Sequence, residues 1–169
     1  MRLTITQGDV TEQAVDAIVN AANPAMRGGG GVDGAIHRRG GPEVLADCIR
    51  RFPQGLDTGR AGWTTAGQLP ARWVIHCVGP VWSAREDRSA LLRSCYVEAL
   101  RVADDLGARS VAFPAISAGS YGWPVSDAAR QAVTAVHSAT TDVEEVRFVL
   151  FGAVALDAFE AASAHLEGG

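Results

Sequence analysis

The chain contains no lysine: all fifteen basic side chains among its 169 residues are arginines. A Walker A loop requires a lysine that reaches the β- and γ-phosphates of a nucleotide, and Schiff-base catalysis requires a lysine amine. Both chemistries are excluded. Nineteen acidic residues give a net charge of −4, and the arginines are dispersed, which argues against a broad nucleic-acid-binding surface. A negatively charged ligand must therefore be bound without lysine.

Cysteine and long apolar runs are also scarce. Cys48, Cys77 and Cys95 form no C-x-x-C pair, so neither a disulfide framework nor a structural zinc site is supported. The four histidines show no metal-ligand spacing, so we expect no metal, and His76 fits a hydrogen-bonded core histidine. No run approaches the ~18 apolar residues of a membrane span, and the N-terminus lacks the apolar block of a signal peptide. We expect a cytoplasmic protein that is neither exported nor inserted in a membrane.

The composition, 47% apolar and 20% charged, is that of an ordinary globular protein, and its length predicts one domain spanning residues 1–169. Short apolar runs alternate with segments of helical period, which predicts an α/β fold with a largely internal sheet. Strands are expected at Arg2–Thr6, Ala17–Asn20, Gly62–Ala66, Trp73–Val78, Ser110–Ala115 and Arg147–Phe151. Helices are expected from Val32, from Pro42 to Arg51, from Leu92 to Leu106, after a Ser126-Asp127 N-cap, and from Val154 to Leu166.

Glycine is concentrated in one place: seven of the nineteen glycines lie between positions 28 and 41, four of them consecutively at Gly28–Gly31. A tetraglycine is tolerated mainly where the backbone approaches something closely or adopts positive φ. Here it follows an expected strand and precedes an expected helix. Backbone amides and the helix dipole would then bind an anion without lysine. The only two asparagines, Asn20 and Asn23, stand just before this loop and are candidates either to cap a turn or to hydrogen-bond a sugar hydroxyl.

A second loop, Ser117–Pro124, also follows an apolar strand and leads into a helix. Two such loops at strand ends would flank one crevice for an elongated, phosphate-bearing ligand. Tyr121 then packs on a sugar ring or fills the edge of the core, and Asp9 either caps a turn or accepts from an exocyclic amine. Ser117 lacks the G-x-S-x-G context of a serine hydrolase, and no G-x-G-x-x-G of a Rossmann-type NAD enzyme follows the first strand.

These motifs resemble those of the macrodomains, and within them the MacroD-type ADP-ribosyl hydrolases. The segment Asn20–Gly41, NAANPAMRGGGGVDGAIHRRGG, is similar to their signature along its whole length. The similarity continues through GDVT at 8–11, HCVGPVW at 76–82 and FPAISAGSYGWP at 113–124, and so covers nearly the whole chain. The resemblance implies a three-layer α/β/α sandwich with a mixed, mostly parallel central sheet and an ADP-ribose crevice across its top.

The resemblance also implies a set of site residues. Asp9 would accept from the adenine amino group with Val10 beside it, and Phe151 would stack on adenine. Asn23 and the segment Gly31-Val32-Asp33 would border the distal ribose and diphosphate, and the main chain from Ser117 to Tyr121 would wrap the diphosphate. The full set of expected substrate-binding residues is Asp9, Val10, Asn20, Asn23, Gly31, Val32, Asp33, Ser117, Ala118, Gly119, Ser120, Tyr121 and Phe151.

The activity implied is hydrolysis of ADP-ribose esters, with Asp33 and Asn23 as the catalytic pair. At a helix N-terminus Asp33 is favoured in its ionised form and would position water, and Asn23 would fix the ribose. The expected partners are ADP-ribose and ADP-ribosylated protein or O-acetyl-ADP-ribose, with nucleic-acid-linked ADP-ribose a further candidate. No cofactor is expected. The alternative is a non-catalytic reader that binds ADP-ribose and recruits partners, and the pairing of Asn23 with Asp33 favours the hydrolase.

Overall fold

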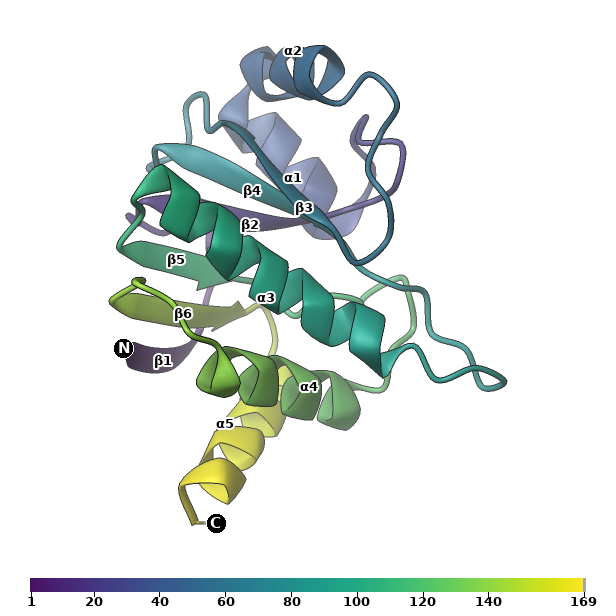
Figure 1. Ribbon diagram of the computed structural model, residues 1–169, viewed down its shortest axis with the longest axis vertical. Helices are drawn as coiled ribbons and strands as arrows, with labels where there is room; N and C mark the ends of the chain where they lie inside the picture. Colours follow the sequence, from purple (N-terminus) through teal and green to yellow (C-terminus); the bar gives the residue numbers. More distant parts are fainter. Residues whose placement is uncertain (169) are drawn as a thin grey trace.

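Six strands form one sheet in the order β1-β6-β5-β2-β4-β3 in a computed structural model that describes residues 1–168 (Figure 1). The strands are β1 (Arg2–Gln7), β2 (Ala17–Ala22), β3 (Ala61–Thr65), β4 (Trp73–Val78), β5 (Ser110–Phe113) and β6 (Glu145–Leu150). All neighbouring pairs are parallel except β3 with β4, which is antiparallel. The prediction of a mixed, mostly parallel sheet is confirmed.

Helices cover both faces of the sheet. They are α1 (Gly31–Gly40), α2 (Pro42–Arg51), α3 (Ser89–Leu106), α4 (Val125–Ser138) and α5 (Ala153–Gly168), with a short 3₁₀ turn at Val10–Glu12. Figure 1 shows α3 and α4 in front of the sheet, α1, fainter, behind it, and α2 at the top of the view, beyond β4 and β3. The helix α5 packs on α4 and on β1 and β6. This is the predicted three-layer α/β/α arrangement.

Covered faces explain the apolar character of the central strands. In β2 and β4 nearly every side chain is buried, as is usual for parallel strands packed on both sides. The larger core lies on the α3–α5 side and contains Tyr96, Phe113, Phe148 and Phe159. The three cysteines are all buried, as expected for packing residues.

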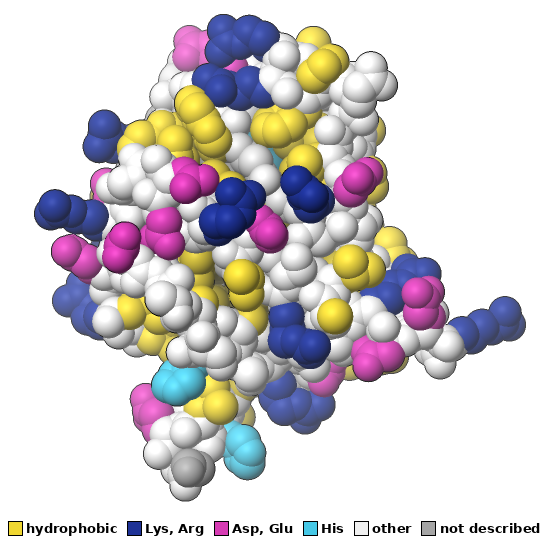
Figure 2. Space-filling model, viewed as in Figure 1, with side chains coloured by type: hydrophobic (Ala, Val, Ile, Leu, Met, Phe, Trp, Pro, Cys, Tyr) yellow, Lys and Arg dark blue, Asp and Glu magenta, His cyan; other side chains and the backbone are white. Residues whose placement is uncertain are grey.

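Acidic and basic side chains are interspersed on the face drawn in Figure 2. On α3, for example, Arg101 pairs with Glu98 at 2.6 Å and with Asp105 at 3.3 Å. No helix among residues 1–168 has both the length and the apolarity needed to cross a membrane.

Several element boundaries differ from the expectations: for example, β2 continues to Ala22 and α3 begins at Ser89. The helix α4 begins at Val125 with Pro124 as N-cap, so the predicted Ser126-Asp127 cap is wrong, and the Asp127 carboxylate instead accepts from the Trp123 indole at 2.9 Å. The strand β5 ends at Phe113 because Pro114 has no N–H to continue the ladder. Similarly, β6 ends at Leu150, which places Phe151 beyond the strand.

The carboxyl ends of five parallel strands meet at one edge of the sheet. The segments that follow them begin at Gly8, Asn23, Gly79, Pro114 and Phe151. Ligands of open α/β sheets bind at this edge, outside the strand ends. The motifs identified in the sequence are therefore assembled there by topology alone.

Candidate functional site

Two adjoining cavities lie at the carboxyl edge of the sheet. The smaller is about 180 Å³ and the larger about 580 Å³. Gly31, Val32, Ala115 and Gly119 line both, so the cavities form one elongated cleft between the glycine loop and the loop after β5. A crevice in this place was predicted from the two loops that follow strand ends.

The predicted residues divide between the two cavities. Asn23, Gly31, Val32, Asp33, Ser117, Gly119, Ser120 and Tyr121 line the smaller cavity. Asp9, Val10, Gly31, Val32, Ala118, Gly119 and Phe151 line the larger one. Asn20 lines neither.

The N-terminus of α1 opens onto the smaller cavity. The helix begins at Gly31, after an N-cap Gly30 that offers no side chain, and its first turn bond runs from the Gly34 N–H to the Gly30 carbonyl at 3.2 Å. The amides of Gly31, Val32 and Asp33 precede that bond and have no intrahelical acceptor. Donors of this kind, reinforced by the helix dipole, bind anions such as a diphosphate.

The Asp33 carboxylate is buried at the wall of this cavity, with a residue exposure of 6%. Its Oδ1 accepts from the Asn20 Nδ2 at 2.9 Å and lies 3.3 Å from the His37 Nε2. Its Oδ2 faces Gly29: a Cβ built there would stand 3.2 Å from Asp33 Oδ2 and 3.3 Å from Asn23 Nδ2. The functional groups of Asp33 and Asn23 therefore converge beside Gly29.

Asn23 ties the glycine loop together as well as lining the cavity. Its Nδ2 donates to the Gly28 carbonyl at 3.1 Å, and its Oδ1 accepts from the Met26 amide at 3.2 Å. Met26 adopts a positive φ of 60° in this turn. The turn-capping and cavity-lining interpretations of Asn23 are thus compatible.

The direct substrate contact predicted for Asn20 needs correction. Its side chain is fully buried in β2 and does not reach the cavity. Side chains in a strand alternate between the two faces of the sheet, and that of Asn20 points toward α1, where it contacts Asp33. Its Nδ2 donates to Asp33 and also lies 3.1 Å from the His76 Nδ1. Asn20 contacts the predicted catalytic carboxylate and not the cleft.

Sequence reasoning did not single out His37 as a site residue. It lies one turn after Asp33 on α1 and, as noted above, contacts the Asp33 carboxylate. The signal was present, since side chains four residues apart share a face of a helix.

The loop after β5 reaches the cleft in a strained conformation. Ser117 has a positive φ of 68°, is buried, and donates its hydroxyl to the Pro80 carbonyl at 2.7 Å. A Cβ at Gly79 would lie 2.5 Å from the Ser117 Oγ, so glycine is needed for this close approach. The hydroxyl therefore holds the loop after β5 against the segment after β4.

The larger cavity is lined mainly by apolar groups and by Asp9. The Asp9 Oδ1 accepts from the Thr11 hydroxyl at 2.6 Å and from the Thr11 amide at 2.9 Å, so Asp9 does cap a turn. Those hydrogen bonds, led by the one from the hydroxyl, hold the pKa of Asp9 below its usual value despite partial burial. Phe151 stands at the mouth, 87% exposed. Arg38, which the sequence analysis did not select, also lines this cavity.

The sequence is similar to a known protein family and to several known proteins. The family model described as "Macro domain" matches residues 19–132. A macro domain-containing protein of Streptomyces coelicolor is 65% identical over 94% of this chain and 96% of its own length. An O-acetyl-ADP-ribose deacetylase of Escherichia fergusonii is 49% identical over 89% of this chain and 88% of its own length.

Solved structures of macrodomains have a similar fold. A mutant macrodomain of Oceanobacillus iheyensis with ADPR superimposes with a TM-score of 0.93 at 38% identity, covering 98% of this chain and 93% of that one. The family match spans the asparagine motif, the glycine loop and the loop after β5. The chain therefore belongs to the Macro domain family.

Proposed function

We propose that the chain binds ADP-ribose in the cleft and hydrolyses esters of ADP-ribose. The substrates would be O-acetyl-ADP-ribose and mono-ADP-ribosylated aspartate or glutamate side chains. The observation that carries the proposal is the convergence of Asp33 and Asn23 beside the free amides at the start of α1. The names of the Escherichia relative and the Oceanobacillus structure support the same ligand.

The shape and chemistry of the cleft suit ADP-ribose in one orientation. The larger, mostly apolar cavity with Asp9 and Phe151 suits adenine, because a carboxylate accepts from the exocyclic amine and an exposed aromatic ring stacks on the base. The amides at the start of α1 and the loop after β5 suit the diphosphate at the waist. The distal ribose then lies in the smaller cavity, beside Asp33 and Asn23.

In the proposed reaction, water adds across the ester C–O bond and gives ADP-ribose and the free carboxylic acid. Asp33 Oδ1 accepts the hydrogen bond from Asn20 and lies 3.3 Å from the His37 Nε2, whereas Oδ2 lies on the side of Gly29 at the cleft and is placed to orient the water. Asn23 fixes the ribose through its carboxamide. An ionised carboxylate is a modest base, so we propose that the diphosphate of the substrate shares in activating the water.

The burial of Asp33 and the side chains around its carboxylate favour hydrolysis over a reader role. A reader needs the cleft alone, whereas here a buried carboxylate is oriented by two further side chains and directed toward the ribose subsite. Burying a charge in this way is costly unless it is hydrogen-bonded, and such sites are typical of positioned acids and bases.

A panel of ADP-ribosylated acceptors tests the proposal. The panel comprises O-acetyl-ADP-ribose, an ADP-ribosyl-glutamate peptide, Ser- and Arg-linked peptides and a 5′-phosphate-linked oligonucleotide, each scored for released ADP-ribose. We expect release from the two esters, because each has a carbonyl carbon that the oriented water can attack with release of the ribose oxygen, whereas the Ser-linked ether and the Arg-linked N-glycoside have no carbonyl carbon at the linkage. Tight binding of ADP-ribose without release from either ester would support the reader instead.

A further inference from the structure

His76 and Thr64 lie in the core directly behind Asn20 and line neither cavity. His76 is 1% exposed in β4, and Thr64 is fully buried in the neighbouring strand β3. The two side chains contact each other, with the Thr64 Oγ1 2.8 Å from the His76 Nε2. Neither residue is used by the proposed reaction, although a histidine and a threonine buried among apolar strands need a reason to be there.

The direction of every hydrogen bond in this group follows from Asp33. An ionised carboxylate only accepts, so the group of Asn20 that faces Asp33 Oδ1 at 2.9 Å must be the amide nitrogen. The same nitrogen lies 3.1 Å from the His76 Nδ1, which must then accept. The imidazole proton therefore resides on Nε2, where it is donated to the Thr64 hydroxyl, and that hydroxyl donates in turn to the Thr65 carbonyl at 3.0 Å.

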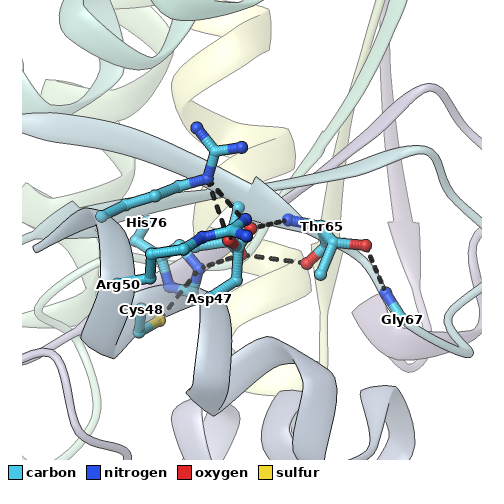
Figure 3. A network of polar contacts seen from close by, with 8 residues as sticks. Asp47, Cys48, Arg50, Thr65, Gly67 and His76 are labelled. Carbon is cyan, nitrogen blue, oxygen red and sulfur yellow. Dashed lines mark hydrogen bonds and ion pairs between the residues drawn. The ribbon is translucent and has the colours of Figure 1, made fainter.

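The far end of this series of hydrogen bonds, at Thr65, is held by α2 near the surface of the protein. The Thr65 amide donates to Asp47 Oδ2 at 2.8 Å, and Asp47 is paired with Arg50 and Arg51. Figure 3 shows His76 beside Cys48 and the contacts that connect Thr65 to Asp47 and Gly67. The position of the Thr64–Thr65 segment is thereby fixed independently of the cleft.

His76 is held in its neutral form. Burial, followed by the nearby His37, lowers the pKa of His76 to about 3. A neutral imidazole has one donor and one acceptor, and which nitrogen carries the proton is decided by its partners. Here the Asn20 amide requires an acceptor at Nδ1, and the Thr64 hydroxyl, whose own proton goes to the Thr65 carbonyl, supplies an acceptor for the proton on Nε2. The Cys48 Sγ lies farther from Nε2, at 3.7 Å.

We propose that Thr64 and His76 are positioning residues that set the orientation of the Asn20 carboxamide and, through it, of the Asp33 carboxylate. This inference rests on the proposed function, because it assigns these residues a part in the same reaction. With the proton on Nδ1, the imidazole would face Asn20 with a donor and favour the flipped carboxamide. The flipped carboxamide would present oxygen to the Asp33 carboxylate, acceptor against acceptor, and displace Asp33 from its position in the cleft.

The kinetic test compares two variants of one residue. Thr64→Val keeps the shape of the side chain but removes the acceptor for the His76 Nε2–H, whereas Thr64→Ser keeps the hydroxyl and loses only a methyl group. We expect Thr64→Val to lower kcat for the acetyl ester by at least about tenfold, the scale of a displaced catalytic group, with KM and ADP-ribose affinity unchanged. We expect Thr64→Ser to retain most of the wild-type kcat. Equal kcat in Thr64→Val and wild type would overturn the proposal.

A double variant separates positioning from a general loss of packing. In the Asp33→Asn background the carboxylate is already absent, so Thr64→Val should cause no further fall in the residual rate. A further fall of the same size as in the wild-type background would show that Thr64 acts on something other than Asp33.

An NMR measurement is independent of turnover. The ¹⁵N shifts of the His76 ring in the folded wild-type protein should show protonated Nε2 and unprotonated Nδ1, and Thr64→Val should raise the fraction with the proton on Nδ1. A wild-type ring protonated on Nδ1, or a ring unaffected by Thr64→Val, would overturn the proposal that Thr64 and His76 orient the Asn20 carboxamide. If the wild type hydrolyses no ester, the proposed function fails, while this NMR measurement still decides whether Thr64 sets the protonation of the His76 ring.

Discussion

The two carboxylate oxygens of Asp9 have different surroundings, and this separates its two predicted roles. Oδ1 is engaged by Thr11, while Oδ2 lies 3.7 Å from Arg39 at the wall of the larger cavity. Asp9→Asn can keep the cap and places an amide donor where the second acceptor stood. We expect ADP-ribose binding, measured by calorimetry, to weaken by about 1–3 kcal/mol, the value of a hydrogen bond to a charged group.

A matched control weakens the turn at Asp9 and keeps the carboxylate. Thr11→Val loses the hydroxyl bonded to Asp9 Oδ1, so it should lower thermal stability while binding changes little. An analogue with a carbonyl in place of the adenine amino group should bind the wild type more weakly than ADP-ribose and should bind Asp9→Asn about as well as ADP-ribose does. Unchanged affinity of Asp9→Asn would leave Asp9 as a turn cap alone.

At the residue scale, the sequence located the cleft but not the layer beneath it. Asp33 and Asn23 were identifiable because they belong to contiguous motifs beside the glycine loop. The contact of Asn20 with His76, 56 residues apart, depends on the pairing of β2 with β4, which no local pattern encodes. Asn20 was therefore taken for a ligand contact, and His76 was recognised only as a core histidine.

Two glycines near the start of α1 serve different purposes, and substitution should reveal this. A Cβ at Gly34 would lie 2.6 Å from the Gly29 carbonyl oxygen, so Gly34→Ala must push the loop off the helix. We expect a lower melting temperature and weaker ADP-ribose binding. A Cβ at Gly29 meets only the ends of the Asp33 and Asn23 side chains, so Gly29→Ala should lower kcat and leave the melting temperature nearly unchanged. Equal losses of stability would contradict this distinction.

The loop after β5 combines a strained φ with a buried hydrogen bond at Ser117. Ser117→Ala keeps the positive φ and leaves the Pro80 carbonyl without its donor, which should cost about 1–3 kcal/mol of unfolding free energy. Ser117→Gly loses the same bond but adopts this φ freely, so its cost should be smaller. Urea denaturation of both variants measures the difference, and a larger loss in Ser117→Gly would show that the φ is not strained.

At the scale of elements, the expected order of strands and helices is confirmed, and the ends are less accurate. Apolar periodicity depends on burial, which continues past the end of an element. The run through Ala115 and the run through Phe151 were therefore read as strand although Pro114 and the bend at Phe151 end the ladders earlier. The predicted end of α3 at Leu106, by contrast, is correct, and Gly107 follows it in the left-handed conformation that strongly favours glycine.

The stability of the whole molecule should depend on pH through His76. In the unfolded chain a histidine binds a proton below its ordinary pKa of about 6.5, whereas burial in the folded protein lowers the pKa of His76 to about 3. The titratable groups around it are His37, Asp33, Asp47 and the Cys48 thiol, which lies 3.7 Å from the His76 Nε2. The unfolded state then binds more protons, so stability falls as the pH drops through 6.5. The expected contribution is about 2 kcal/mol between pH 8 and pH 5.

Urea unfolding at several pH values checks this contribution. His76→Gln should show a pH dependence flatter than the wild type by that amount over this range. His137→Gln, which changes an exposed histidine on α4, serves as the control for mutation alone. Parallel curves for wild type and His76→Gln would mean that His76 is protonated in the folded protein as readily as in the unfolded chain.

At the scale of the whole molecule, the fold class followed from the alternation of apolar runs with helical segments, and the sheet order did not. The insertion of β5 and β2 between β6 and β4 depends on long-range pairing that leaves no mark on any single segment. The clustering of motifs at one edge could nevertheless be anticipated, because parallel strands send all their carboxyl ends to the same side.

Hydrolysis directed by Asp33 is tested most directly by separating binding from turnover in one variant. Asp33→Asn is nearly isosteric and removes only the charge, and Asp157→Asn on the exposed side of α5 is the matched control. We predict that Asp33→Asn binds ADP-ribose within a few-fold of wild type while kcat for an ADP-ribosyl-glutamate ester falls about 10²-fold or more, with Asp157→Asn unchanged. A folded Asp33→Asn protein that binds ADP-ribose and cleaves the ester at the wild-type rate would contradict the assignment of Asp33 as the catalytic carboxylate.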